Sequence, residues 1–335
     1  MSQSIPEFFP AFRIHAADGF QGAAVEQVSL DQLSPGEVVL EVEYSSVNFK
    51  DALAGSGRGK ILRLPELNGG IDLAGTVVAS EHADFTPGQK VLANGSGLSE
   101  VHDGGYSHYA RIPAEWLMPM PPGLDTRSAM ILGTAGFTAA LAVQRLLDNH
   151  QQVEQGPIVI TGASGGVGSF AVQLLTQLGF DVIAMTRKQE HHAYLRSLGA
   201  QDVRHTDELN NNASPMLKGQ WGGAIDNLGG DVLASLSKSV KPWGNIVSVG
   251  MAAGVELNTS TMPFILRGVS ILGVTSAACP QALRKNIWQR LGSDWLPQKL
   301  EAVCAVEIGL QELPQAFDAL LKGQVQGRQL VRVKS

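Results

Sequence analysis

Short apolar runs alternate with stretches of helical periodicity in the second half of the chain. The runs with a strand pattern lie at 158–160, 181–185, 224–226, 245–249 and 269–272. Apolar residues at helical spacing follow the first run, from Phe170 to Leu178. Strands that alternate with helices in this way predict a parallel, doubly wound α/β sheet.

The first 125 residues show a different pattern, in which short strand-like runs are separated by glycine and proline turns. The runs lie at 38–42, 75–78 and 90–92, and the pattern predicts a compact β-rich domain. An apolar helix expected over 128–147 leads into the second half, and the segment 310–333 contains a helix-like stretch and a strand. We therefore expect residues 1–126 and 308–335 to form one domain and residues 127–307 to form the other.

The segment 158–178 combines a strand, a glycine-rich turn and an apolar-faced helix. In such a turn Gly165 would let the backbone approach a pyrophosphate, and Gly168 would let the helix pack closely on its strand. The helix N-terminus adds free N–H groups and the positive end of its dipole. We expect a dinucleotide to bind here, although a glycine turn without a ligand is the alternative. The binding residues would be Ser164, Gly165, Gly166, Val167 and Gly168.

The end of the strand at 181–185 indicates which dinucleotide binds. Enzymes that use NAD place an acidic residue about 20 residues beyond the glycines, whereas this chain has Thr186, Arg187 and Lys188 there. Two cations and a hydroxyl group attract a 2′-phosphate, so we predict NADPH. A solvated loop with ordinary surface charges is the alternative. At the ends of the later strands, Leu228 and Gly250 would border the nicotinamide.

Composition and charge narrow the range of partners. The chain has 335 residues, of which 44% are hydrophobic and 17% charged, with a formal net charge of −6. The cations form no long run, so we expect neither nucleic acid nor a membrane as a partner. The N-terminus lacks the pattern of a signal peptide, which predicts a cytoplasmic protein. The two cysteines, Cys279 and Cys304, are expected to be reduced thiols.

Several segments resemble the medium-chain dehydrogenase/reductase superfamily. They are VNFKD at 47–51, GIDLAGTVV at 70–78, GGYSHYA at 104–110, GTAGFTAA at 133–140 and TGASGGVG at 161–168. Within the superfamily, segments 45–63, 130–140, 262–274 and 325–333 are similar to the YhdH/YhfP-type, quinone-oxidoreductase-like group, which includes NADPH-dependent acrylyl-CoA reductases.

The resemblance implies a GroES-like β domain beside a Rossmann domain, with the active site in the cleft between them. It also implies a homodimer joined through the last Rossmann strand, here 269–275, and further cofactor contacts from Phe49, Thr134 and Arg328. For the strand the alternative is an edge that is shielded in another way. For Arg328 the alternative is pairing with a neighbouring carboxylate.

The residues argue against zinc. Zinc-dependent relatives have a cysteine where this chain has Asn48 and a histidine-glutamate pair where it has Ile71-Asp72. Neither Asn48 nor Ile71 is a plausible zinc ligand. His102 and His191-His192 are ligands in principle, but adjacent histidines in a polar stretch are usually surface residues. We expect no metal.

Alcohol oxidation usually relies on a Lewis acid that holds the alcohol as an alkoxide. Since no such metal is expected, we predict the reduction of an activated C=C bond instead. The β-carbon would receive the hydride of NADPH, the enolate oxygen would need hydrogen-bond donors, and the α-carbon would need a proton. Asn48 is the candidate donor, and Lys50 and Asp51 could orient the substrate or the nicotinamide ribose. Alternatively, Asp51 fixes its loop and Lys50 is solvated. Tyr106 could donate a proton or simply pack.

Arg58, Lys60 and Arg63 lie on a glycine-rich loop and could contact the phosphates of a CoA thioester, or they could be solvated. The predicted reaction is the NADPH-dependent reduction of acrylyl-CoA to propionyl-CoA. A quinone or enone reductase is one alternative. An NADPH-binding protein with a sensing or interaction role is the other, because cofactor motifs specify binding more firmly than chemistry.

Overall fold

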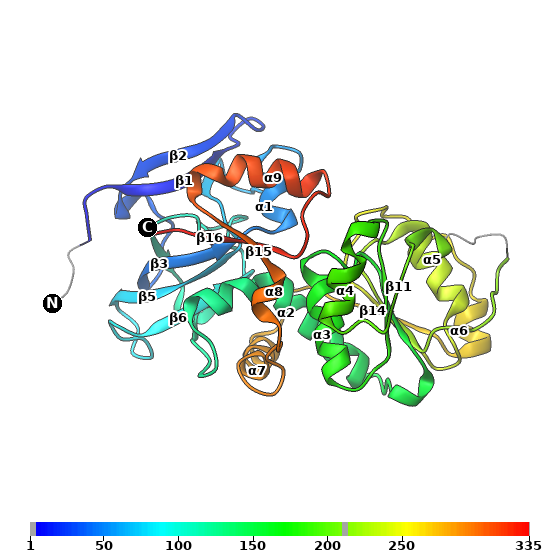
Figure 1. Cartoon of the computed structure of the whole chain (residues 1–335). Coiled ribbons are helices and arrows are strands. Elements are labelled where there is room, and N and C mark those ends of the chain that lie inside the picture. Colours follow the sequence, from blue (N-terminus) through cyan, green and yellow to red (C-terminus); the bar gives the residue numbers. More distant parts are fainter. Residues whose placement is uncertain (1–4, 210–213, 335) are drawn as a thin grey trace. The chain divides into compact units, whose positions relative to one another are not determined.

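The structure is a computed structural model that describes residues 5–209 and 214–334. It divides into two compact units (Figure 1). The first contains residues 1–134, 277–296 and 304–335, and the second contains residues 135–276 and 297–303. This division places 277–296 in the first unit, whereas the sequence pattern predicted that all of 127–307 would belong to the second domain.

The first unit is built around a seven-stranded sheet and a three-stranded sheet. The large sheet has the order β15-β16-β3-β5-β6-β8, and β7 also pairs with β3; the small sheet has the order β2-β1-β4. The strands of the large sheet are β3 (Val38–Ser46), β5 (Asp72–Ser80), β6 (Lys90–Asn94), β7 (Tyr109–Ile112), β8 (Met118–Pro119), β15 (Cys304–Ile308) and β16 (Arg328–Arg332). Those of the small sheet are β1 (Phe9–His15), β2 (Gly22–Val28) and β4 (Glu66–Asn68). This confirms the expected GroES-like β domain.

Alternation along β3 explains how the large sheet meets its core. Val38, Leu40 and Val42 are fully buried, and the residues between them are partly exposed, as expected when one face of a strand is packed. Two helices, α1 (Phe49–Gly55) and α9 (Leu313–Leu321), lie side by side in this unit (Figure 1). Their contact is close, because a Cβ on Gly55 would lie 2.3 Å from a ring atom of Phe317.

Helix α7 (Gln281–Leu291) accounts for the placement of 277–296. The buried Arg284 donates to the backbone oxygen of Asn94 at 2.6 Å and to its Oδ1 at 3.0 Å, and Trp288 Nε1 donates to the same Oδ1 at 2.9 Å. These bonds tie α7 to the end of β6, about 190 positions earlier in the chain. No local pattern in the sequence indicates such a pairing.

The second unit is a doubly wound parallel sheet with the order β11-β10-β9-β12-β13-β14. Its strands are β9 (Ile158–Ile160), β10 (Val182–Met185), β11 (Asp202–Arg204), β12 (Gly223–Asp226), β13 (Asn245–Ser248) and β14 (Ser270–Gly273). In Figure 1, α3 (Gly166–Gln177) and α4 (His192–Leu198) lie on one face of the sheet, and α5 (Gly230–Ser239) and α6 (Met262–Arg267) on the other. The central strands are buried along their whole length, because helices cover both faces.

Helix α2 (Thr126–Asp148) leads from the first unit into the second and is interrupted at Gly133, whose φ of 48° and ψ of −154° are not helical. Judged by length and composition alone, this helix is long and apolar enough to cross a membrane. However, 78% of its most apolar window is buried inside the protein, as is typical of a core helix. The short helix α8 (Leu300–Val303) completes the second unit.

Candidate functional site

A buried polar network lies in the first unit, with Asp72 at its centre. Asp72 is fully buried at the start of β5. Its Oδ2 accepts hydrogen bonds from Ser46 Oγ at 2.5 Å, Asn48 Nδ2 at 2.8 Å and the Thr134 amide at 2.9 Å. Its Oδ1 accepts from Thr134 Oγ1 at 2.5 Å. Thr134 and Asn48 were both expected at the site, and the structure brings them together on one carboxylate.

Arg328, at the start of β16, supplies the positive charge of this network. It is only 4% exposed, and its Nη2 lies 3.7 Å from Asp72 Oδ2. The guanidinium of Arg328 donates hydrogen bonds to four acceptors within the protein: the backbone oxygens of Ile131 and Val47, Asn48 Oδ1 and Ser46 Oγ. Burial lowers the pKa of the guanidinium, and the charge of Asp72 opposes this. Arg328 is therefore engaged with a carboxylate, which was the alternative to a cofactor contact.

Asp51 is the second buried carboxyl group, on the first turn of α1. Asp51 caps its own helix, because its Oδ2 accepts hydrogen bonds from the backbone N–H of Asn48 at 3.0 Å and from the side-chain Nδ2 of Asn48 at 3.1 Å. Its Oδ1 accepts the Ile71 amide at 2.9 Å. Burial, followed by the charge of Asp72, raises the pKa of Asp51 to about 7. These contacts correspond to the alternative in which Asp51 fixes its loop.

Gly133 lets α2 reach the network. A Cβ at this position would lie 2.5 Å from Asp72 Oδ2, 2.6 Å from Ser46 Oγ and 2.7 Å from Arg328 Nη2. Its positive φ also strains any residue with a side chain. The break in the helix thus allows the Thr134 amide and hydroxyl to bind Asp72, and only glycine fits there.

Two predicted donors have other partners in this structure. The Asn48 side-chain amide donates to Asp51 and Asp72, so no amide hydrogen is left for a substrate oxygen. The expected donor role of Asn48 therefore has no support in this geometry. Tyr106 is fully buried and donates to the Ser46 oxygen at 3.0 Å. Burial raises the pKa of Tyr106 well above its usual value, so its packing role is favoured over proton donation.

The network does not fit a zinc ion. Its oxygen groups already surround the guanidinium of Arg328, and it contains neither a thiolate nor an imidazole, the ligands that zinc prefers. Among residues 5–209 and 214–334, no group of three or more His, Cys, Asp or Glu is arranged to hold a metal.

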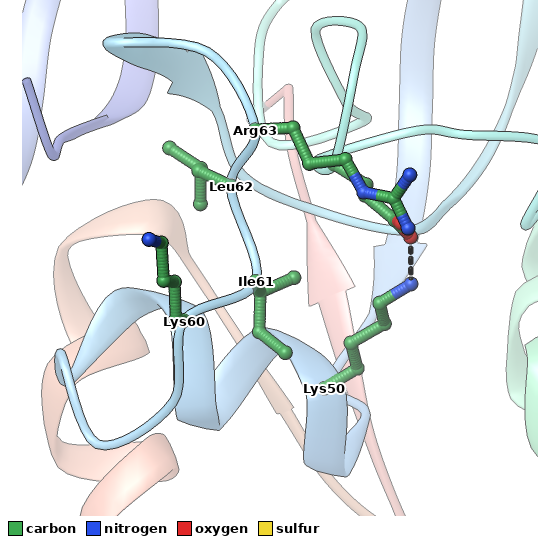
Figure 2. A pocket seen from close by; sticks show the side chains of 6 residues that line it. Lys50, Lys60, Ile61, Leu62 and Arg63 are labelled. Carbon is green, nitrogen blue, oxygen red and sulfur yellow. Dashed lines mark hydrogen bonds and ion pairs between the residues drawn. The ribbon is translucent and has the colours of Figure 1, made fainter.

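A pocket of about 450 Å³ lies beside α1, within the first unit (Figure 2). It is lined by Lys50, Lys60, Ile61, Leu62, Arg63 and Glu100. Lys50 forms an ion pair with Glu100, and Arg63 Nη2 lies 2.8 Å from the same carboxylate. The Lys50 contact, and then that of Arg63, keeps the pKa of Glu100 below its usual value, so this carboxylate is ionised at neutral pH. The pocket brings Lys50, Lys60 and Arg63 together.

Arg58, the third cation predicted to bind phosphate, does not line this pocket. Its Nη2 lies 3.3 Å from Asp318 on α9, and Asp318 also pairs with Lys322 at 2.5 Å. These groups are largely exposed. The predicted set of three cations is therefore divided, with only Lys60 and Arg63 at the pocket.

The glycine turn of the second unit lies between β9 and α3, as predicted. A Cβ on Gly168 would lie 2.5 Å from Ala163 Cα, so helix and turn pack too closely for any side chain. A Cβ on Gly165 would meet nothing nearer than the Gly162 oxygen at 3.4 Å. No side chain caps the helix at Gly165, so the amides of the first turn, those of Gly166, Val167 and Gly168, are available to an anion.

The end of β10 lies next to this turn. Thr186 is buried, and its hydroxyl lies 3.4 Å from that of Ser164 and accepts the Lys188 amide at 3.2 Å. Arg187 is exposed, and Lys188 is partly exposed. The hydroxyl groups therefore bridge the two βα turns, and both cationic residues follow directly at the carboxyl edge, where a 2′-phosphate is expected.

Three other predicted contacts remain open to a cofactor. Leu228 and Gly250 follow the adjacent parallel strands β12 and β13 and are partly exposed. The Gly250 turn is tight, because a Cβ there would lie 2.5 Å from the Asn227 oxygen. Phe49 is 51% exposed at the start of α1. Their contacts with a cofactor stay predictions.

Two residues that organise the site, Asp72 and Glu100, were not predicted from the sequence. Asp72 was considered only as the counterpart of a zinc ligand, although a lone acid at the start of an apolar strand is a signal for a buried polar partner. Glu100 gave no signal, because its partner Lys50 lies 50 positions away. The roles of both residues depend on partners that are distant in the sequence.

Comparisons with known proteins agree with this architecture. A model of the alcohol dehydrogenase GroES-like domain matches residues 34–122, and one described as zinc-binding dehydrogenase matches residues 166–292. Probable acrylyl-CoA reductase AcuI of Escherichia coli K12 is 45% identical over 96% of this chain and 99% of its own length. Putative quinone oxidoreductase YhfP of Bacillus subtilis is 42% identical over 92% of this chain and 94% of its own length.

Solved structures show the same relationship. Escherichia coli K-12 YhdH with bound NADPH has a TM-score of 0.93 and 44% identity, covering 97% of this chain and all of that one. Bacillus subtilis YhfP with NAD bound also has a TM-score of 0.93, with 40% identity over 98% of this chain and all of that one. The chain belongs to the medium-chain dehydrogenase/reductase superfamily and, within it, to the quinone-oxidoreductase-like group of YhdH and YhfP.

Proposed function

We propose that this protein is an NADPH-dependent reductase of activated C=C bonds that converts acrylyl-CoA to propionyl-CoA without zinc. The observation that carries the proposal is 45% identity, over nearly the whole chain, to a protein named probable acrylyl-CoA reductase. The network around Arg328 supports it, because a guanidinium cannot activate an alcohol as a Lewis acid does.

The second unit supports the choice of cofactor. The uncapped start of α3 can bind a pyrophosphate, and Arg187 and Lys188 at the end of β10 can attract a 2′-phosphate. When bound, NADPH supplies the hydride. Because the YhfP structure holds NAD, the preference for NADPH needs its own test.

The reaction requires one hydride at the β-carbon of the substrate and one proton at the α-carbon. Between these steps, negative charge develops on the thioester oxygen and is stabilised by a hydrogen-bond donor. We assign this contact to Lys50. Its ammonium is paired with Glu100 but lines an open pocket, whereas Asn48 and Tyr106 donate within the buried network. Asp51 acts as a positioning residue, which holds the first turn of α1 through Asn48.

A quinone or enone reductase is the second candidate, favoured by the similarity to the protein named putative quinone oxidoreductase YhfP. Such an activity uses the same hydride but has no need of a CoA-binding surface. Competition between acrylyl-CoA and a quinone separates the two functions.

The assembly and location belong to the same proposal. We infer a cytoplasmic homodimer that acts on a small molecule and binds neither nucleic acid nor membrane. Strand β14 is an edge of its sheet, and Ile265 and Leu266 on the preceding helix are 76% and 64% exposed. The free edge of a terminal strand beside exposed apolar residues is typical of a surface that another chain covers.

The test is the loss of NADPH absorbance with acrylyl-CoA, run beside crotonyl-CoA, free acrylate and a simple quinone, and repeated with NADH. We expect the highest kcat/KM for acrylyl-CoA with NADPH. A faster reaction with quinone would contradict the substrate, and an equal rate with NADH would contradict the cofactor. Tight NADPH binding with no turnover of any alkene would instead indicate a sensing role.

A further inference from the structure

The loop 59–63, which forms one wall of the pocket beside α1, is held in a fixed position. Leu62 is 8% exposed and belongs to the core of the first unit. The backbone amide of Arg63 donates to the backbone oxygen of Glu100 at 2.8 Å, and the backbone amide of Gly59 donates to the backbone oxygen of Leu53 at 3.2 Å. The cationic side chains of the loop therefore project from an anchored backbone.

The charges around this pocket do not balance. Three cationic side chains line it, but only one carboxylate, that of Glu100, and this carboxylate is shared by Lys50 and Arg63. Figure 2 shows Lys60 on one side of the pocket and the ends of Lys50 and Arg63 on the other, with Ile61 between them. An anion in the pocket would thus meet positive charge on both sides.

Lys60 carries the uncompensated charge. In the part of the chain that the structure describes, its ammonium has no hydrogen-bond or ion-pair partner, and the side chain is exposed. The neighbouring Arg58 differs, because it is paired with Asp318. Phosphate groups bind such unpaired ammonium groups and the planar guanidinium of arginine.

We propose that Lys60 and Arg63 bind the phosphate groups of the CoA moiety, with Lys60 as the main contact. This inference rests on the proposed function. Ile61 supplies an apolar surface between the charges, on which the uncharged part of the thioester can lie. Arg63 is held ready by Glu100 and is 72% exposed, so it can turn to a phosphate without leaving a buried group unpaired.

Two substrates that differ only in their phosphates test the subsite. Acrylyl-CoA and acrylyl-pantetheine, which lacks phosphates, are compared at saturating NADPH in the wild type, Lys60→Gln and Lys60→Glu. We expect Lys60→Gln to raise KM for acrylyl-CoA by about 3- to 10-fold, and Lys60→Glu to raise it further. KM for acrylyl-pantetheine, kcat and the Kd of NADPH stay unchanged, which separates CoA phosphates from those of NADPH. Lys285→Gln, at an exposed lysine on α7 in the same unit, is the matched control.

Calorimetry with free CoA separates this inference from the proposed function. If acrylyl-CoA is not reduced but CoA binds and Lys60→Glu weakens its binding, the subsite stands and the proposed substrate is wrong. If acrylyl-CoA is reduced but both Lys60 variants keep the wild-type KM and CoA affinity, the subsite is wrong and the proposed function stands. An equal rise of KM for both substrates would also overturn it, because the effect would not depend on phosphate.

Discussion

Two buried carboxyl groups, those of Asp51 and Asp72, share one buried guanidinium, that of Arg328. Both are within reach of the Asn48 amide, which connects them. Two negative charges and one positive charge in a buried site leave one charge uncompensated. Burial, and after it the charge of Asp72, raises the pKa of Asp51 to about 7, so that Asp51 retains its proton at lower pH.

This pKa predicts how stability depends on pH. The unfolded Asp51 ionises near pH 3.8 and the folded one near pH 7, so between these values the native state holds the extra proton. Its contribution is fully present below about pH 4 and is lost as pH rises to about 7, at roughly 1 kcal/mol per pH unit. Asp51→Asn should remove this part of the slope in urea unfolding between pH 5 and pH 8. Parallel curves for the two proteins would contradict the raised pKa.

Lys50 carries a separate prediction for catalysis. If its ammonium stabilises the thioester oxygen in the transition state, Lys50→Met should lower kcat by about 100-fold, and Lys50→Arg should keep part of the activity. The Kd of NADPH should not change. Lys90→Met is a matched control, because Lys90 pairs with Glu43 in the same unit. A kcat for Lys50→Met like that of the control would assign the stabilising contact to another group.

The sequence alone indicated the members of this site better than their roles. Asn48, Asp51, Thr134 and Arg328 were all predicted, and the structure brings them together. Their expected partners were a substrate and a cofactor, whereas the structure pairs them with one another through Asp72. Motifs give positions along the chain, but hydrogen-bond partners depend on contacts between segments as far apart as β5 and β16.

At the scale of elements, the turn between β9 and α3 assigns different tasks to its two central glycines. Gly168 has no room for a side chain beside Ala163, whereas Gly165 has. Close packing of the helix therefore requires glycine at position 168. At position 165 the requirement comes from the close approach of a ligand. The two positions can be separated by measuring stability and NADPH affinity independently.

Alanine at each position tests this division. Gly168→Ala should destabilise the protein by about 1–3 kcal/mol in urea unfolding, because the helix must move away from the turn. Gly165→Ala should change stability by less than about 1 kcal/mol but weaken NADPH binding by at least about 10-fold, since the added methyl group obstructs the pyrophosphate. Fluorescence titration with NADPH measures the second effect. Unchanged affinity in Gly165→Ala would move the pyrophosphate away from this turn.

Most elements of the second unit were predictable because their signals are local. The expected strands at 158–160, 224–226 and 245–249 match β9, β12 and β13 to within one residue at each end. Strands buried on both faces read as continuous apolar runs between turns. By contrast, α7 was assigned to the other domain, because its position depends on Arg284 and Trp288 reaching Asn94.

The whole chain forms two units with separate hydrophobic cores, and each unit holds a different part of the machinery. The first holds the pocket and the buried network, and the second holds the nucleotide turn. The proposed homodimer would add an interface between two copies of the chain. Edge strand β14 and the exposed Ile265 are the features that a second copy would cover.

Sedimentation analysis tests the assembly. We expect a mass of about twice 35.5 kDa for the wild type. Ile265→Asp should shift the equilibrium toward the monomer, because a buried, unpaired charge opposes association. A wild-type mass of 35.5 kDa at micromolar concentration would contradict the dimer.

In the proposed reaction the protein adds a hydride to the β-carbon of a conjugated thioester. The most direct measurement is mass spectrometry of the product formed from acrylyl-CoA and NADPH that carries deuterium at the transferred position. We expect propionyl-CoA with one deuterium at C3, and, with unlabelled NADPH in D₂O, one deuterium at C2. Recovery of unreduced acrylyl-CoA, or propionyl-CoA without deuterium at C3, would contradict it.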